Sequence, residues 1–346
     1  MRAALITEFN KPLEIGLVDD PSPSPGGIVL RVEATGVCRS DWHAWVGHEK
    51  LPELPHVPGH EMAGTIEAVG AEVERWRPGD RVIVPFSIGC GVCDSCSDGH
   101  LNTCDRPFTP GFTHWGSFAE LAAIDHADPN LVRLPPDLDP VHAAALGCRF
   151  ITAFRAVTDR GQIVPGQWLA VHGCGGVGLS AVMIGAALGA QVVAVDIDER
   201  KLEMATALGA ATVVDATTTE DAGRTVREVS HGGAHVSIDA VGTTSAALNS
   251  IRSLRKHGRH IQVGLMYGDD AAPPIPMDPI MMREIEILGS RGMPAHHYPR
   301  VFDLISSGSV DPRKLVTATV PLEGISRVLA DMDDYSGVGV TVIDRI

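Results

Sequence analysis

The sequence lacks any apolar run that approaches the roughly 20 residues of a membrane-spanning helix. Its opening residues, Met1–Thr7, also lack the apolar segment of a secretory signal peptide, and acidic Glu8 follows them directly. From these two absences we expect a cytoplasmic protein with no membrane partner.

Positive charge is scarce as well. The 346 residues include 28 Lys and Arg against 43 Asp and Glu, a formal net charge of −15. A surface of this sign argues against nucleic acid as the main partner, and it is an ordinary source of solubility. The hydrophobic fraction of 44% and charged fraction of 21% are typical of a globular protein, and the length suffices for two domains.

Cysteines are few and unevenly placed. Of the seven in the chain, four fall within fifteen residues as Cys90-x2-Cys93-x2-Cys96-x7-Cys104. Such crowding in a cytoplasmic chain indicates a metal before disulfides. Four thiolates with no open position suit a closed, structural zinc site, which we place in a lobe over about residues 89–105.

An iron–sulfur cluster is the competing interpretation of these four cysteines. The bacterial ferredoxin run has a shorter last spacing and a proline after it, whereas here Asp105 follows the last cysteine. Thiols without metal are the third alternative.

The first part of the chain, residues 1–149, is predicted to be an irregular β domain whose loops carry the reactive residues. Proline- and glycine-rich turns separate its β-rich runs, which are Ala3–Thr7, Ile28–Thr35, Gly64–Val69 and Arg81–Val84.

Residues 150–290 have a different pattern, in which strands and helices alternate as in a parallel sheet covered on both faces. The predicted strands are Trp168–His172, Gln191–Val195, Ala211–Val214, Val236–Asp239, Arg259–Val263 and Ile285–Leu288, and the helices are Leu179–Leu188, Glu199–Leu208 and Thr244–Leu254. Six parallel strands fit a doubly wound dinucleotide fold, so the fold class is α/β.

The remaining segment, residues 291–346, is too short to fold alone. It contains two predicted helices, Tyr298–Ser306 and Glu323–Met332, and a strand over Val338–Ile343. We expect it to pack back onto the first domain.

A glycine-rich loop joins the first predicted strand to its helix, as Gly173-Cys174-Gly175-Gly176-Val177-Gly178. Glycines at these positions permit a tight turn and bring the backbone close to a pyrophosphate, whose charge lies at the helix N-terminus. Asp196 ends the second strand, eighteen residues after Gly178. The loop therefore predicts dinucleotide binding, with Cys174 as a small buried filler.

A second metal site is indicated by His60 and Glu61, which lie in a glycine-punctuated turn before an apolar strand. Alone, such a pair is more often a solvated turn. Cys38 and Cys148, both in apolar settings, add two thiolates. Two thiolates and one imidazole leave the fourth corner of a tetrahedral zinc open, as catalysis requires.

Together these residues resemble the zinc-dependent alcohol dehydrogenases of the medium-chain dehydrogenase/reductase superfamily over essentially the whole chain. The motifs that carry the resemblance are Gly59-His60-Glu61-x2-Gly64-x5-Gly70, Cys38-Arg39-Ser40-Asp41-Trp42-His43, the four cysteines, Ala145-Leu146-Gly147-Cys148 and the glycine loop. The resemblance implies a GroES-like catalytic domain, a Rossmann domain, and reversible NAD-dependent oxidation of a primary or secondary alcohol.

The resemblance also implies residue roles at the metal. Cys38, His60 and Cys148 would bind a catalytic zinc, with Glu61 as an alternative or transient ligand, so that the chain would hold two zinc ions. Alcohol dehydrogenase is itself the known example of a Cys₂His catalytic zinc, so this ligand set rests on the resemblance. Asp41 would orient His60 and fix its tautomer.

For proton transfer, the resemblance implies a relay from Ser40 through His43 to solvent, and no other histidine shows a comparable setting. For the cofactor, Arg39 would meet the pyrophosphate, and Asp196 with Lys201 the adenosine ribose. The further cofactor residues would be Gly173, Gly175, Gly176, Val177, Gly178, Val241, Val263 and Leu265. A carboxylate at Asp196 favours NAD, whereas nearby Arg200 leaves NADP as the alternative.

The substrate pocket is predicted from Phe86, Trp115 and Leu265, which are bulky and apolar, so an aliphatic or aromatic alcohol is expected over a sugar. Trp42 and Trp45 fit the core and the pocket equally well.

Rival functions are the polyol dehydrogenases, which have a carboxylate in place of Cys148, the zinc-free quinone reductases, and a non-catalytic zinc or redox sensor. The chain lacks the extra segments of longer dimeric members, which favours a homotetramer over a dimer.

Overall fold

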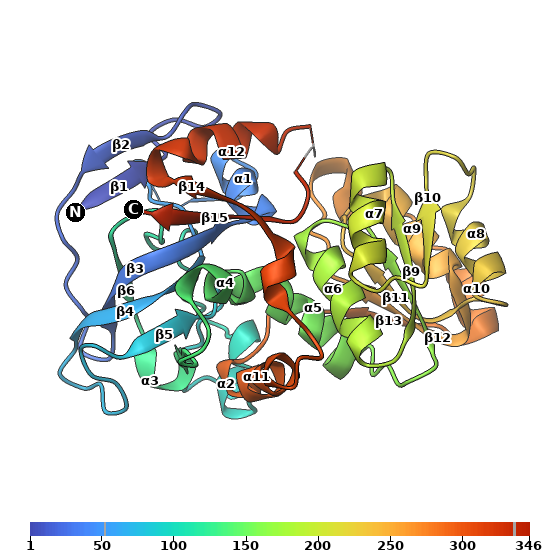
Figure 1. Ribbon diagram of the computed structural model, residues 1–346, viewed down its shortest axis with the longest axis horizontal. Helices are drawn as coiled ribbons and strands as arrows, with labels where there is room; N and C mark the ends of the chain where they lie inside the picture. Colours follow the sequence, from blue (N-terminus) through green and yellow to red (C-terminus); the bar gives the residue numbers. More distant parts are fainter. Residues whose placement is uncertain (52, 335–336) are drawn as a thin grey trace. The chain divides into compact units, whose positions relative to one another are not determined.

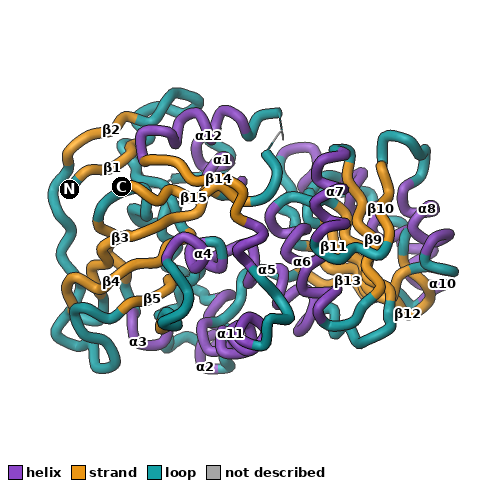
Figure 2. Tube along the Cα trace, viewed as in Figure 1, coloured by secondary structure: helices purple, strands orange, loops and turns teal. Residues whose placement is uncertain are grey.

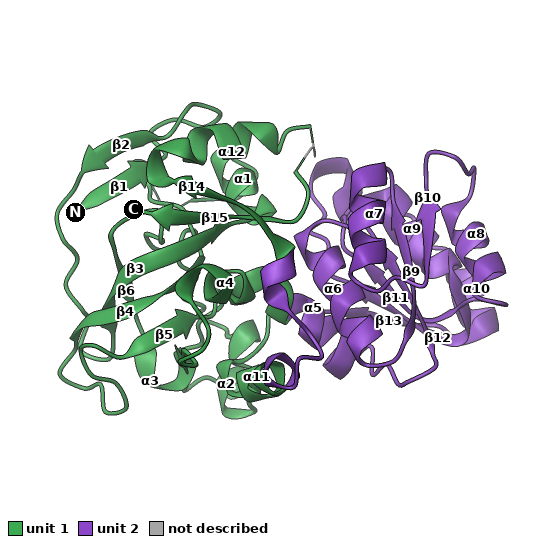
Figure 3. Cartoon of the chain, viewed as in Figure 1, with its two compact units in different colours: residues 1–151, 292–303, 315–346 green, residues 152–291, 304–314 purple. Residues whose placement is uncertain are grey.

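The computed structural model describes residues 1–51, 53–334 and 337–346, which form two compact units (Figure 3). Unit 1 is Met1–Ile151, Gly292–Asp303 and Leu315–Ile346, and unit 2 is Thr152–Arg291 and Leu304–Lys314. The segment Leu304–Lys314 thus groups with unit 2 through its packing, whereas the sequence pattern assigns all of 291–346 to the first domain. In the described ranges no helix has both the length and the apolar character to cross a membrane.

Unit 1 is built on a sheet in the order β14-β15-β3-β4-β5-β7, with β6 paired to β3. A separate hairpin pairs β1 with β2. The strands of the unit are β1 Arg2–Leu5, β2 Glu14–Leu17, β3 Ile28–Val37, β4 Glu61–Val69, β5 Arg81–Val84, β6 Leu121–Ile124, β7 Val132–Arg133, β14 Val316–Pro321 and β15 Val340–Arg345 (Figures 1 and 2).

The C-terminal strand β15 completes this sheet. It pairs antiparallel with β3, from Thr341 opposite Val37 to Ile343 opposite Thr35, while β14 lies parallel on its other side. The sequence analysis predicted a strand here but missed β14, although its Val-Thr-Ala-Thr-Val run alternates apolar and polar residues.

Short helices surround the unit 1 sheet. They are α1 Arg39–Trp45, α2 Asp94–Ser97, α3 Ala127–Asn130, α4 Pro140–Ala144, α11 Tyr298–Ser306 and α12 Ile325–Asp331. A π-helical turn, Leu146–Phe150, connects α4 to α5, Ile151–Arg155. The unit's core lies under both sheets and includes Phe118, Leu30, Ile66 and Ile343, all at most 1% exposed.

Unit 2 is a six-stranded parallel sheet in the order β10-β9-β8-β11-β12-β13. Its strands are β8 Trp168–His172, β9 Gln191–Asp196, β10 Thr212–Asp215, β11 Ala234–Asp239, β12 Leu254–Gln262 and β13 Glu286–Gly289. Its helices are α6 Gly176–Ala187, α7 Glu199–Ala207, α8 Ala222–Val229, α9 Thr244–Arg252 and α10 Met277–Arg283. From β8 the chain adds β9 and β10 on one side of the sheet and then β11, β12 and β13 on the other side, as in the doubly wound dinucleotide fold.

Candidate metal centres and dinucleotide loop

The first candidate centre, which we call the mixed cluster, consists of Cys38, His60, Glu61 and Cys148. Cys38 lies between β3 and α1, and His60 precedes β4 directly. Because β3 and β4 are antiparallel and pair Gly36 with Glu61, the end of one strand lies beside the start of the other. The π-helical turn that contacts β4 supplies Cys148.

The donor atoms of the mixed cluster lie within 4.8 Å of one another, and all four residues are buried. Nε2 of His60 has no hydrogen-bond partner in the described part of the chain, although the residue is fully buried. A buried polar atom without a partner costs free energy, so this nitrogen is suited to a ligand. The soft donor set of two sulfurs and one imidazole fits zinc.

The two thiols of the mixed cluster also form a setting that suits a cation. The hydrogen bond from Cys148 lowers the pKa of Cys38, whereas the same contact, together with burial, raises the pKa of Cys148. One of the two sulfurs therefore holds the proton for both, since two adjacent buried thiolates repel each other. A divalent cation between them would allow both to ionise.

Asp41 orients His60. Its Oδ1 lies 2.8 Å from His60 Nδ1, and its Oδ2 accepts a hydrogen bond of 2.8 Å from the Cys38 backbone N–H. Both side chains are fully buried. Because Asp41 engages Nδ1, the imidazole presents Nε2 to the cluster.

Glu61 is held by Arg149, a residue that the sequence prediction missed. Arg149 Nε donates to Glu61 Oε1 at 2.9 Å, Arg149 Nη2 donates to Oε2, and the guanidinium is 7% exposed. A Cβ on Gly36 would lie 2.1 Å from Glu61 Oε2, so only glycine leaves room for the pair. Burial is the largest influence on Glu61 and raises its pKa to about 7. A charged residue in the apolar run around Cys148 was the available signal.

The proposed relay residues lie on α1, and a second missed residue accompanies them. Ser40 Oγ is 3.8 Å from Cys38 Sγ. His43 Nδ1 is 3.0 Å from Nδ1 of His48, a histidine that the sequence prediction did not include. Burial, and then the positive charge of Arg39, lower the pKa of His43 to about 4. The spacing of His48, just past the end of α1, could have marked it.

Arg39 and the two tryptophans of α1 have clear positions. The Arg39 guanidinium stacks on Trp42 at 3.5 Å from the ring centroid and donates to the Met332 carbonyl. Trp45 is 6% exposed and belongs to the core, where its indole N–H donates to the Lys11 carbonyl at 2.6 Å. Of the two alternatives left open for Trp45, the core is therefore the one observed.

Of the predicted pocket residues, Phe86 packs directly with Cys38 and Cys148 and is 9% exposed. Its ring lies 6.0 Å from His60, and Phe112, which the prediction did not include, lies 5.2 Å from the same imidazole. Trp115 is 39% exposed. An aromatic wall thus borders the mixed cluster within unit 1.

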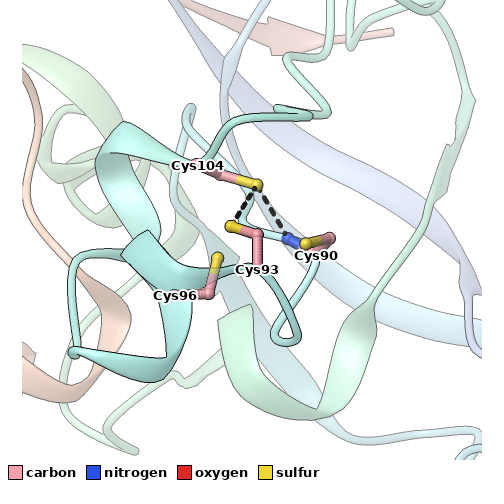
Figure 4. Close-up of side chains that lie close together, drawn as sticks. All are labelled: Cys90, Cys93, Cys96 and Cys104. Atoms are coloured by element: carbon pink, nitrogen blue, oxygen red, sulfur yellow. Dashed lines mark hydrogen bonds between the residues drawn. The ribbon is translucent and has the colours of Figure 1, made fainter.

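The second candidate centre, the four-cysteine lobe, consists of Cys90, Cys93, Cys96 and Cys104, whose sulfurs also lie within 4.8 Å of one another (Figure 4). Cys93 Sγ and Cys104 Sγ are 3.7 Å apart. Two sulfurs bound to one zinc at about 2.3 Å with tetrahedral angles would be about 3.8 Å apart, so the lobe has the size of a single-ion site.

Backbone N–H groups already favour thiolate in this lobe. Cys104 Sγ accepts from the N–H of Cys90 and of Arg106, each at 3.3 Å. Hydrogen bonds from the backbone of Val92 and then of Cys93 lower the pKa of Cys90 to about 6, while burial raises that of Cys96 to about 12. A cation would be needed before all four sulfurs ionise.

The glycine loop lies between β8 and α6 in unit 2. Gly173 has a φ of +94°. A Cβ on Gly178 would lie 1.7 Å from the Gly173 carbonyl oxygen, so helix and loop pack too closely for any side chain. Cys174 is fully buried, as expected of a filler.

Asp196 at the end of β9 is turned toward this loop. Its Oδ2 accepts from the Cys174 N–H at 2.6 Å, and its Oδ1 accepts from the N–H groups of Ile197 and Asp198 at 2.8 and 3.0 Å. Lys201 on α7 is 7% exposed. Backbone donors thus fix the position of the carboxylate beside the glycine loop.

The other predicted cofactor residues follow β11 and β12. Val241 and Leu265 are 42% and 45% exposed, and Val263 comes directly after β12. Asp239 fixes the Val241 loop, because its Oδ1 accepts from the Val241 N–H at 2.8 Å and its Oδ2 from Gln262 Nε2 at 2.8 Å.

Comparison with known proteins gives a consistent result. Residues 24–136 match the alcohol dehydrogenase GroES-like domain, and residues 176–307 match the zinc-binding dehydrogenase family. An alcohol dehydrogenase of Geobacillus stearothermophilus is 34% identical over 96% of each chain, and an NAD-dependent alcohol dehydrogenase of Sulfurisphaera tokodaii is 32% identical over 99% of each. A solved alcohol dehydrogenase from Thermus sp. ATN1 has a TM-score of 0.90 at 30% identity, with 99% of each chain covered.

Proposed function

Because the chain belongs to the zinc-dependent alcohol dehydrogenases of the medium-chain dehydrogenase/reductase superfamily, we propose that it catalyses reversible hydride transfer between a primary or secondary alcohol and NAD. The products are the aldehyde or ketone and NADH. The observation that carries this proposal is the mixed cluster, in which a buried His60 Nε2 without a partner faces two cysteine sulfurs.

The catalytic zinc would be held by Cys38, His60 and Cys148, with Glu61 as an alternative ligand during turnover. A zinc ion held there would supply Lewis acidity to the oxygen of the alcohol or carbonyl. The hydrogen bond from His60 to Asp41 keeps Nε2 available to the metal. The ion pair with Arg149 holds Glu61 back from the ligand set, so that a change of ligand would require this pair to loosen.

The proton of the alcohol would leave through Ser40, which is next to Cys38 in space, and through His43. Burial keeps His43 neutral in the neutral pH range, which is the form able to accept a proton. The contact with His48, an exposed residue, extends this path by one imidazole toward solvent.

The second zinc would occupy the four-cysteine lobe and stabilise the fold. All four sulfurs lie within 4.8 Å of one another, which favours one ion over an iron–sulfur cluster, since the four thiolates of a cluster are shared among two or more irons and must spread apart. No position is left for substrate, because four thiolates complete a tetrahedron.

In unit 2, the N–H groups of the glycine loop and the N-terminus of α6 would bind the pyrophosphate of NAD. Bound there, NAD would supply the acceptor for the hydride. Asp196 favours the ribose hydroxyls over a 2′-phosphate through its charge. The ratio of kcat/KM for NAD and NADP tests this step, and a preference for NADP would contradict it.

The substrate would be an apolar alcohol, since Phe86 and Phe112 present aromatic rings beside His60. We further propose a homotetramer in the cytoplasm, where a reducing environment keeps the seven cysteines as thiols. Light scattering should then give four times the 36.6 kDa chain mass, whereas twice that mass would indicate the dimer.

The test of the function is NADH appearance with a panel of aliphatic, aromatic, polyol and hydroxy-acid substrates. We expect turnover of the apolar alcohols. Preference for polyols or hydroxy acids would contradict the pocket assignment. Absence of turnover with every substrate would favour the non-catalytic sensor.

A further inference from the structure

A second feature of unit 2 lies outside the dinucleotide loop. A surface cavity of about 460 Å³ is lined by Arg227, Gly232, Arg255, Lys256, His257 and Arg283. These residues come from the end of α8, the loop before β11, the first residues of β12 and the end of α10. Figure 1 labels these helices and strands. We call this feature the basic cavity.

The basic cavity and the glycine loop lie at opposite ends of the strands of the same sheet. Arg255 and Lys256 begin β12, and Gly232 and Arg283 precede β11 and β13. Because the strands are parallel, these positions all lie at the amino-terminal ends of the strands. Gly173 follows β8 and lies at the carboxyl-terminal ends of the strands, where the dinucleotide of such folds binds. The basic cavity is therefore a separate site.

The positive charge in the basic cavity is mostly uncompensated. Arg227 donates to the Leu254 carbonyl, and Arg255 Nη1 contacts the His235 imidazole at 2.8 Å, so neither meets a carboxylate there. Over the described residues, no hydrogen bond or ion pair is formed by the side chains of Lys256 and Arg283.

The acidic residue at the edge of this cavity is Glu284, whose Oε2 lies 3.0 Å from Nδ1 of His257. One carboxylate thus faces four guanidinium or ammonium groups. Burial, and then the charge of Arg283, also lower the pKa of Arg227, as expected when cations crowd together.

We propose that the basic cavity binds a small anion with two or more phosphate groups. Arginine and lysine are the side chains that recognise phosphate, arginine through paired hydrogen bonds and lysine as a point charge. A cavity of about 460 Å³ is in the range of small-molecule sites, about 300–1,000 Å³. A nucleic acid is disfavoured by the net charge of −15, which repels a long polyanion beyond the cavity.

The test is calorimetric titration of the full chain with inorganic tripolyphosphate at fixed ionic strength. A slight excess of NADH is present, so that the glycine loop is occupied. We expect one tripolyphosphate per chain. Lys256→Gln with Arg283→Gln should raise Kd by at least about tenfold for each lost charge-assisted hydrogen bond. Neither side chain has a structural partner, so the double variant should fold and keep its dehydrogenase activity.

The matched control is Arg224→Gln with Arg252→Gln, which removes two exposed charges from α8 and α9 outside the cavity. Its Kd should stay within about twofold of the parent value, which corresponds to a change in binding free energy below about 0.5 kcal/mol. Equal weakening in both double variants, or no binding to the parent chain at millimolar tripolyphosphate, would overturn the proposal. Activity with alcohols is measured separately, so this failure would leave the proposed function standing.

A titration with ATP in the absence of magnesium identifies the source of the phosphates. Binding tighter than that of tripolyphosphate would indicate a nucleotide. Weaker binding would indicate an inorganic polyphosphate.

Discussion

The two cysteine-containing centres differ in how the chain brings their ligands together. The four-cysteine lobe uses residues 90, 93, 96 and 104, which are close in sequence and lie in loops and the four-residue helix α2. The mixed cluster uses residues 38, 60, 61 and 148, which are far apart and are joined by the pairing of β3 with β4. We therefore propose that a metal would order the chain in the lobe, whereas in the mixed cluster the folded chain would position the metal.

The surroundings of the two centres agree with this difference. In the lobe, the sulfurs meet backbone N–H groups and Arg106. In the mixed cluster, side chains that are fully buried hold the ligands, as Asp41 holds His60. Removal of metal should therefore damage stability at one centre and chemistry at the other.

The largest effect is expected for Cys148→Ser. This change removes a proposed ligand of the open site. The Lewis-acid contribution of several kcal/mol should then be lost, so kcat/KM should fall by at least about a thousandfold. The thermal unfolding midpoint should stay close to that of the parent. Activity above about a tenth of the parent value would break the assignment of this centre to catalysis.

The converse change is Cys93→Ser in the lobe. Loss of a structural metal should lower the free energy of unfolding by on the order of 4–5 kcal/mol, measured by urea denaturation. At a temperature where the variant stays folded, its kcat should remain near the parent value. An unchanged unfolding midpoint would contradict the structural role of the lobe.

Arg149→Met sharpens the comparison, because it asks whether the mixed cluster also supports the fold. It leaves Glu61 buried without its partner, which should cost about 3–5 kcal/mol of unfolding free energy. Arg31→Met is the matched control, since the Arg31–Glu67 pair is 55% and 46% exposed and should contribute at most about 1 kcal/mol. Equal losses in the two variants would contradict the buried-pair argument.

The smallest effect is expected for His43→Gln. Alcohol oxidation should slow by about a hundredfold near neutral pH, and less at high pH, where hydroxide takes the proton. His142→Gln, which changes a histidine paired with Asp139 on α4, is the control. A loss of rate that does not vary with pH would show that His43 is not in the proton path.

The depressed pKa of His43 also predicts a change in stability with pH. The folded pKa is about 4 and the unfolded value about 6.5, so the unfolded chain binds the proton more readily between them. This contribution to stability is complete above about pH 6.5 and is lost as the pH falls toward about 4. His43→Gln should remove that part of the pH dependence in urea titrations.

Residue types and local spacing predicted most of the elements and motifs whose residues are close together in the sequence. Strands β5 and β8 and helix α11 have the predicted bounds, because alternation and turn residues define them locally. The four-cysteine lobe and the glycine loop are likewise contiguous in sequence. The two centres therefore differed in predictability, as the mixed cluster was assigned through resemblance.

Contacts made by tertiary packing were not predictable in this way. Arg149 is charged in an apolar run, and only the position of Glu61 across the fold explains its burial. The pairing of His43 with His48 depends on the geometry of the turn after α1. The grouping of Leu304–Lys314 with unit 2 is likewise a property of packing, without a composition signal.

Zinc content is the most direct test of an open catalytic centre beside a closed structural one. Elemental analysis of the purified, zinc-loaded chain should give two zinc ions per chain, and one in Cys148→Ser. Cys174→Ser, which removes a buried thiol outside both clusters, should retain two. One zinc per chain in the parent protein, with no further loss in Cys148→Ser, would contradict the account.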